Sequence, residues 1–144
     1  MTLSRDVFGK TSDGREVHRF TLEAASGLRA EIISYGAVLK SLKVPDRKGN
    51  AEEVTLGFDT LAEYEANRRF FGATIGRFGN RIAGGKFFID GKPITLATNN
   101  APNHLHGGNL GFDRVLWDSQ AFEQEGIASV VFSYLSRDGE EGYP

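Results

Sequence analysis

The chain has 144 residues, the length of one ordinary domain, and its 17 Lys and Arg nearly balance its 19 Asp and Glu. This balance leaves no broad basic face for a phosphate backbone, so nucleic acid is not expected as a partner. The absence of cysteine excludes disulfides and thiolate metal sites. Because the sequence has neither a signal-peptide pattern nor an apolar run of membrane-helix length, we predict a cytoplasmic protein without a membrane contact.

Closely spaced turns divide the first part of the chain into short segments typical of β structure. Asp13-Gly14 predicts a tight hairpin turn. The segment after it, Val17 to Glu23, alternates as a half-buried strand does, with Phe20 and Leu22 on one face. Further strands are expected over residues 28–34, 37–44 and 53–58, with a Pro-containing turn over residues 45–50.

One segment, Asp59 to Asn67, has a capping residue and good helix formers, which predicts one or two helical turns. A second Asp-Gly hairpin follows over residues 87–96, where Pro93 indicates an edge position. The last pair of strands is expected over residues 114–122 and 127–136. With about nine strands, the predicted class is all-β, an antiparallel β-sandwich.

Residues 99–113 contain two of the three histidines and the densest run of amides. In an extended segment residues two apart share a face, so His104 and His106 are expected to project together while Leu105 turns into the core. Histidine exchanges a proton near neutral pH, which suits it to protonate a substrate oxygen. The glycines that follow allow a sharp turn or the close approach of a bound molecule. The stretch is predicted to form the floor of a polar pocket.

A glycine-rich stretch, residues 72–85, carries Arg77, Asn80 and Arg81. It lacks the flanking strand and helix and the Gly-Lys-Ser/Thr ending of a phosphate loop. Arginine forks beside an amide can bind neighbouring hydroxyls or a carboxylate. The alternative is that both arginines lie on the solvent side of a strand and that Asn80 makes a turn.

Three motifs, in this order, resemble those of the aldose 1-epimerases, also called galactose mutarotases. They are Gly76–Ala83 (GRFGNRIA), Asn103–Gly108 (NHLHGG) running into Gly111–Trp117, and Ser136–Pro144 (SRDGEEGYP). The likeness extends from the first hairpin to the last residue. It implies an isomerase that interconverts the α and β anomers of a free aldose such as galactose or glucose. The implied fold is the large antiparallel β-sandwich of the galactose mutarotase type, a supersandwich, with neither metal nor redox cofactor.

Carried over residue by residue, the resemblance assigns substrate binding to Asn80 and Arg81. It assigns catalysis and substrate binding to His106, which would hold and polarise the sugar near its ring oxygen. His104 falls at a position that varies in the family and is given a supporting role at the substrate site. His18 matches no motif and is expected to be an ordinary strand residue.

The likeness stops at Pro144, inside the third motif, and family members are considerably longer. Residues 1–144 are therefore expected to be the N-terminal portion of a single sandwich domain, here incomplete. The family's second histidine and its glutamate base would lie beyond this portion, so the chain alone is predicted to be inactive. Its exposed edges and apolar faces are expected to self-associate or to pair with the missing C-terminal half.

Four alternatives use the same residues. His104 and His106 have the spacing of strand metal ligands, which would suit a zinc or iron enzyme. Amides, Arg81 and rings such as Trp117 would suit a non-catalytic carbohydrate-binding module. Arg77 facing a phosphate would suit a phosphosugar (hexose-6-phosphate) epimerase. The fourth alternative is a polar turn without a ligand. Glu140 and Glu141 are interpreted as shaping a loop that borders the site, because adjacent residues of an extended chain point apart.

Overall fold

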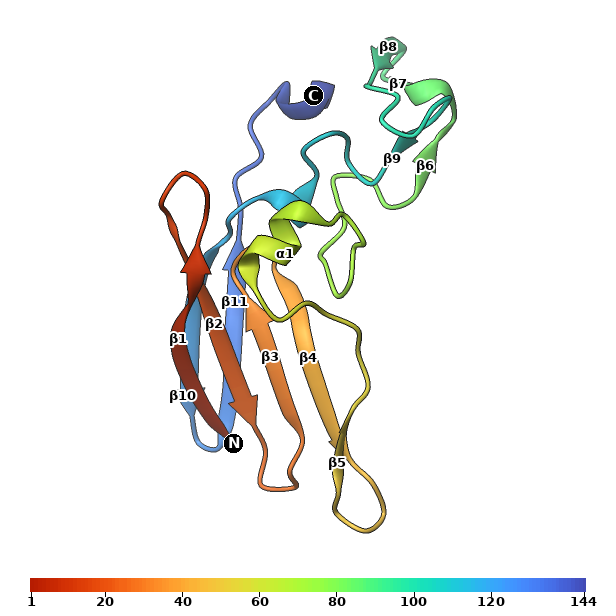
Figure 1. Cartoon of the computed structure of the whole chain (residues 1–144). Helices are drawn as coiled ribbons and strands as arrows, with labels where there is room; N and C mark the ends of the chain where they lie inside the picture. Colours follow the sequence, from red (N-terminus) through yellow and green to blue (C-terminus); the bar gives the residue numbers. More distant parts are fainter. The chain divides into compact units, whose positions relative to one another are not determined.

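A computed structural model describes all residues, 1–144, and consists almost entirely of antiparallel β structure with one short helix (Figure 1). The prediction of an all-β antiparallel fold is confirmed. The chain divides into two compact units, Met1–Ala73 with Leu116–Tyr134, and Thr74–Val115 with Leu135–Pro144. We describe each unit by itself. A single sandwich domain that includes residues 1–144 stays a prediction.

The first unit is built on a five-stranded antiparallel sheet in the order β1-β2-β3-β4-β5. Its strands are β1 Thr2–Lys10, β2 Glu16–Glu23, β3 Arg29–Ile33, β4 Val38–Pro45 and β5 Ala51–Glu53. The Asp13-Gly14 turn is where the sequence predicts it: Gly14 has a φ of +87° and its N–H donates to the carbonyl of Thr11. Neighbouring strands in sequence are therefore neighbours in space, as short polar turns require.

Both faces of β2 carry a fully buried side chain. Val17 and Phe20 are three residues apart and so point to opposite faces. Val17 packs with Ile33 and with Leu61 of the helix, in a cluster completed by Tyr35, Val38 and Tyr64. Phe20 meets the Phe132 ring edge-on at 5.7 Å, which ties the sheet to the hairpin of β10 (Asp118–Gln124) and β11 (Ile127–Ser133). This hairpin contacts β1 and β2 (Figure 1), so the sheet is covered on both faces.

The predicted helix is confirmed as α1, Leu61–Ala66, and it begins one residue later than Asp59 suggests. Thr60 is the N-cap, and its hydroxyl accepts the N–H of Glu63 while the Glu63 carboxylate accepts the N–H of Thr60. This reciprocal box satisfies two of the donors that a helix start leaves open. No helix of the structure has the length and apolarity needed to cross a membrane.

Two predicted strands differ most from the observed ones. The strand expected over residues 53–58 ends at Glu53, because the Glu53 carboxylate accepts the N–H groups of Leu42 and Thr55 at 2.9 and 3.0 Å. The Glu53 side chain thus accepts the Leu42 N–H, a donor that a longer β5 would need for its own backbone pairing. The strand expected from Arg114 begins at Asp118, because Phe112–Arg114 forms a 3₁₀ turn, η2.

The second unit consists of two short ribbons and three 3₁₀ turns. β6 Arg81–Ile82 pairs with β9 His104–Leu105, and β7 Lys86–Ile89 pairs with β8 Lys92–Thr95. The remaining turns are η1 Ala83–Gly85 and η3 Glu140–Gly142. The second Asp-Gly hairpin is confirmed, and Pro93 faces Phe88 in a two-stranded ribbon that has only edges. Leu96, His104 and Val115 are buried in this unit.

Candidate functional site

The two motifs singled out in the sequence meet at the β6–β9 ribbon. Arg81 is the register partner of Leu105, and Ile82 that of His104, which places Asn80 beside His106. The His106 N–H donates to the Asn80 carbonyl at 3.0 Å. In return, the Asn80 N–H donates to His106 Nδ1 at 2.9 Å. The first bond fixes the backbone of His106, and the second its imidazole, to the residue that precedes Arg81.

The second of these bonds defines the tautomer of His106. Because an amide N–H can only donate, Nδ1 must be the acceptor, and the neutral ring carries its proton on Nε2. The ring is partly exposed. A neutral His106 thus presents an Nε2–H donor, which is the group needed to polarise or protonate an oxygen.

Arg81 is held as a fork by two amides. Its Nε donates to Asn100 Oδ1 at 2.9 Å, and its Nη1 donates to Asn80 Oδ1 at 3.1 Å. These bonds orient the guanidinium plane and leave other N–H groups of the fork for a ligand. Asn80, Arg81 and Asn100 are all exposed, so the fork is reachable from solvent.

Asn99 closes the loop that carries His106. Its Nδ2 donates to the carbonyls of Leu105 and Gly108, and its Oδ1 accepts the Leu105 N–H, all at 2.8 or 2.9 Å. One half-buried amide thus replaces the backbone partners that this turn lacks.

Gly107 and Gly108, in the loop that carries His106, allow other segments of the same chain to approach closely. Gly107 has a φ of +86°, and a Cβ there would overlap the carbonyl of Gly76. A Cβ on Gly108 would overlap the Glu141 carboxylate. The close approach that the sequence predicts is therefore observed, but the approaching groups are backbone and side chain of this unit.

The expectation that His104 and His106 share a face is wrong. β9 ends at Leu105, and His106 turns away with a φ of +50°. His104 is fully buried, and its nitrogens lie 2.8 Å from the Ala97 carbonyl and 2.7 Å from the Tyr143 hydroxyl. Leu105, expected in the core, is only half-buried. His104 is thus placed to support the loop that carries His106.

Arg77 is occupied within the second unit. Its side chain is 10% exposed, forms an ion pair with Glu140 and donates from Nε to Ser136 Oγ at 2.6 Å. The guanidinium also lies over the rings of Phe112 and Tyr143, 4.9 and 5.8 Å from their centroids. The solvent-side position considered for Arg77 is therefore wrong, and these contacts give no support to a phosphate-binding role.

Glu140 and Glu141 shape the border of the site, as the sequence indicates. Glu140 binds Arg77, whereas Glu141 accepts the N–H groups of Asn109 and Leu110 at 2.8 and 3.1 Å. The two carboxylates have separate partners and do not form an acid/base pair.

Burial raises the pKa of the nearby Tyr143 hydroxyl. The positive charge of Arg77 opposes this rise, and the negative charge of Glu141 adds to it.

A mainly apolar cavity of about 410 Å³ adjoins Arg81 in this unit. Its walls include Phe78, Ile82, Phe87 and Tyr143. A polar fork beside ring and aliphatic surface is the composition of many small-molecule sites.

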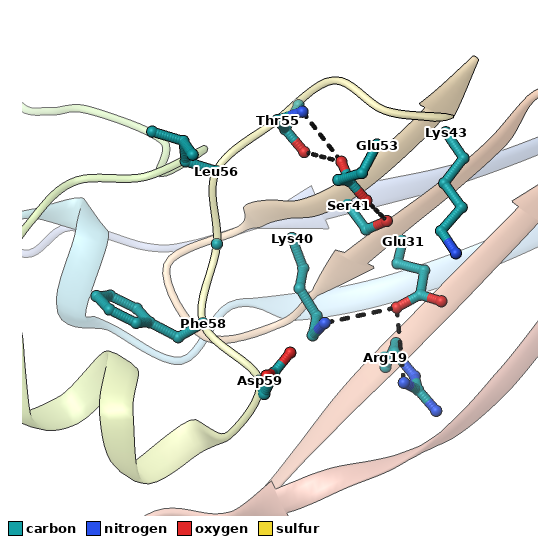
Figure 2. A pocket seen from close by; sticks show the side chains of 11 residues that line it. Arg19, Glu31, Lys40, Ser41, Lys43, Glu53, Thr55, Leu56, Phe58 and Asp59 are labelled. Carbon is teal, nitrogen blue, oxygen red and sulfur yellow. Dashed lines mark hydrogen bonds and ion pairs between the residues drawn. The ribbon is translucent and has the colours of Figure 1, made fainter. Parts of the chain in front are cut away.

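The first unit contains a different kind of pocket, of about 540 Å³, on the β2–β5 part of the sheet (Figure 2). Arg19 and Lys40 converge on Glu31, at 3.6 and 3.9 Å from its Oε2. Glu53 is bound by the hydroxyls of Ser41 and Thr55 (Figure 2). Arg19 and Lys40 thus pair with Glu31, Glu53 is held by hydroxyls, and no histidine lines this pocket.

The structure brings Asn80, Arg81 and His106 together and separates His104 from them. No three His, Cys, Asp or Glu side chains form a group that could hold a metal ion. The sequence did not assign roles to Asn99, Asn100 and Tyr143. The only signal for the two amides was their density beside the histidines, and the only signal for Tyr143 was its place in the third motif.

The sequence model of the aldose 1-epimerase family matches residues 18–144. The galactose mutarotase of Sus scrofa is 46% identical over 145 residues, which cover 100% of this chain and 41% of the relative. The aldose 1-epimerase of Escherichia coli K12 is 34% identical over 92% of this chain and 37% of the relative.

Solved structures give the same result. The galactose 1-epimerase of Lactobacillus acidophilus superposes on 99% of this chain with a TM-score of 0.86 and 26% identity, and 41% of that protein is covered. An aldose epimerase homologue from Caenorhabditis elegans superposes on 86% of this chain with a TM-score of 0.75 and 36% identity. The chain thus spans about 41% of the length of the relatives it matches well. The predicted antiparallel fold of the mutarotase type agrees with these superpositions, and the chain belongs to the aldose 1-epimerase family.

Proposed function

We propose that residues 1–144 supply the substrate-binding fork and one acid/base group of an aldose 1-epimerase acting on free aldoses such as galactose and glucose. The observation that carries the proposal is the hydrogen-bonded group of Asn80, Arg81 and His106, in which the imidazole has one defined tautomer. Arg81 would bind sugar hydroxyls through its fork. His106 would donate from Nε2 to the ring oxygen.

The reaction needs an acid and a base at the same time. A base removes the proton of the C1 hydroxyl, the bond from C1 to the ring oxygen breaks, and an acid gives that oxygen a proton. Rotation about the C1–C2 bond then exposes the other face of the aldehyde, and reversal of the steps closes the other anomer. The net reaction consumes no electrons, so the chemistry asks for no redox cofactor.

This chain would provide only part of that machinery. By family resemblance, the principal acid histidine and the glutamate base belong to sequence beyond these residues, as expected for a chain that spans 41% of a relative. We propose that the chain alone is inactive and that it acts in the cytoplasm together with the missing half. Exposed apolar side chains, among them Leu135 at 82% and Phe88 at 72% exposure, suit burial against such a partner.

A complementation assay tests this function. The chain is mixed with a separately expressed polypeptide equivalent to the remainder of the Sus scrofa galactose mutarotase, and loss of optical rotation of fresh α-galactose is followed. His106→Asn keeps an oxygen that can accept the Asn80 N–H but removes the Nε2–H donor. We expect this variant to lower the catalysed rate roughly 10²- to 10⁴-fold, the usual contribution of acid/base catalysis.

His18→Asn is the matched control, because His18 lies on β2 and matches no family motif. It should leave the catalysed rate unchanged. Equal activity of the wild type and His106→Asn in complementation would contradict the role of His106.

A non-catalytic carbohydrate-binding role is the second candidate, because the exposed Arg81 fork could hold hydroxyls without any proton transfer. It predicts saturable binding of both anomers with no increase in their exchange rate. Calorimetric titration with galactose, run beside polarimetry on the same sample, separates the two functions.

A further inference from the structure

His104 is the one histidine that is fully buried and that the proposed reaction does not use. Its Nδ1 lies 2.8 Å from the Ala97 carbonyl, which can only accept, so Nδ1 carries the proton of the neutral ring. Its Nε2 then accepts from the Tyr143 hydroxyl at 2.7 Å. His104 and His106 are thus held in opposite tautomers although only one residue separates them.

These bonds connect three segments of the second unit. Ala97 precedes the loop, His104 lies in β9, and Tyr143 follows η3. The rings of His104 and Tyr143 meet edge-on with centroids 5.5 Å apart. The imidazole of His104 is fully buried and both of its nitrogens are hydrogen-bonded. It therefore fixes the distance between the loop and the η3 segment.

The fixed distance reaches His106 through the loop backbone. A Cβ built on Gly108 would lie 3.3 Å from His104 Cε1, so the ring supports the backbone two residues after His106. On the other side, Glu141 of η3 holds the N–H groups of Asn109 and Leu110. The loop that carries His106 is therefore held between the His104 ring and the η3 segment.

We propose that His104 is a positioning residue: through Tyr143 and Gly108 it holds His106 in the place where the Asn80 N–H can select its tautomer. The inference rests on the proposed function of His106, but its geometry can be tested without a sugar. A positioning role would explain why His104, which does not belong to the proposed reacting group, lies inside the motif Asn103–Gly108.

The test uses the whole chain labelled with ¹⁵N. Tyr143→Phe removes only the hydroxyl, and His104→Leu removes both ring nitrogens. In both variants we expect the His106 ring signals to change from a single Nε2–H tautomer to a mixture. We also expect the Asn80 amide to exchange roughly tenfold faster or more, because its acceptor is no longer held in place.

His104→Gln should rescue the wild-type tautomer and exchange, because its amide oxygen can still accept from Tyr143. Tyr64→Phe is the matched control: it removes a buried tyrosine hydroxyl from the first unit, where it accepts the Phe58 N–H. It should leave both readouts unchanged.

An unchanged His106 tautomer and unchanged Asn80 exchange in Tyr143→Phe and His104→Leu would overturn the proposal. Faster exchange spread equally over β7 and β8 would also overturn it, since that marks a general loss of stability. Neither readout depends on catalysis. A failed complementation assay would therefore reject the proposed function while leaving this outcome readable.

Discussion

Asn80 and His106 both have left-handed backbone conformations, with φ of +68° and +50°. Such a conformation costs free energy in any residue with a Cβ, and it persists only where neighbouring contacts impose it. Here one backbone–backbone hydrogen bond and one bond from the Asn80 N–H to the His106 ring join the two residues and impose it. The strained backbone orients the imidazole ring of His106, and an acid/base role depends on that orientation.

Gly107→Ala tests how closely the site is built. The new Cβ meets an unfavourable φ of +86° and also overlaps the carbonyl of Gly76. Gly91→Ala in the β7–β8 turn is the matched control, with a φ of +74° and open space around its Cβ. The control should lose about 1 kcal/mol of unfolding free energy from φ alone, whereas Gly107→Ala should lose about 3 kcal/mol or more.

Hydrogen exchange of the β9 amides gives their opening free energies. Because Gly107, Gly91 and β9 all lie in the second unit, these values compare the two variants directly. Equal losses would mean that the Gly107–Gly76 approach is not essential to the fold.

At this scale the sequence predicted which residues form the candidate site but not their geometry. Residue types and motif order led to Asn80, Arg81 and His106. The shared face of His104 and His106 assumed an extended chain, and a single positive φ at His106 removes that assumption. The roles of Asn100 and Tyr143 depend on contacts across 19 and 39 positions, which no local pattern encodes.

Glu53 shows how one side chain ends an element. Its carboxylate accepts the Ser41 and Thr55 hydroxyls and the N–H groups of Leu42 and Thr55. Burial opposes ionisation, but these hydrogen bonds outweigh it and lower the pKa of Glu53 from 4.5 to about 2.

A carboxylate whose pKa is lower in the folded chain stabilises the fold above its unfolded pKa. The contribution of Glu53 should therefore be complete above pH 4.5 and be lost as the pH falls toward about 2. Glu53→Gln should unfold at lower urea concentration than wild type at pH 7, and the difference should shrink toward pH 2.

Glu52→Gln, the exposed neighbour on β5, is the control and should follow the wild-type curve. A difference between Glu53→Gln and wild type that persists unchanged to pH 2 would contradict the assignment.

Elements with local signals were predicted well. Asp-Gly turns fix both hairpins within a few residues, and α1 follows from its cap and helix formers. The ends of β5 and β10 were predicted wrongly, because a folded-back carboxylate and a 3₁₀ turn replace ladder bonds there.

An aromatic contact, Phe20 with Phe132, joins the sheet of the first unit to the β10–β11 hairpin. Phe20 is fully buried against Phe132, whereas Phe122 of β10 is 51% exposed. Phe20→Ala should cost about 3–5 kcal/mol of unfolding free energy, and Phe122→Ala at most about 0.5 kcal/mol. Urea unfolding followed by fluorescence of Trp117, the single tryptophan of the chain and part of this unit, measures both. Similar losses for the two variants would contradict the placement of Phe20 in the core of the first unit.

On the scale of the whole molecule, we propose that this chain holds a sugar-binding group that needs further residues for catalysis. The most direct measurement is polarimetry of fresh α-galactose with the purified chain, after its mass has been verified as 15.8 kDa. We predict the spontaneous rate with the chain alone and a faster rate once the complementing polypeptide is added. Acceleration by the chain alone, abolished in His106→Asn, would contradict the account, because the acid and the base would then both lie within these 144 residues.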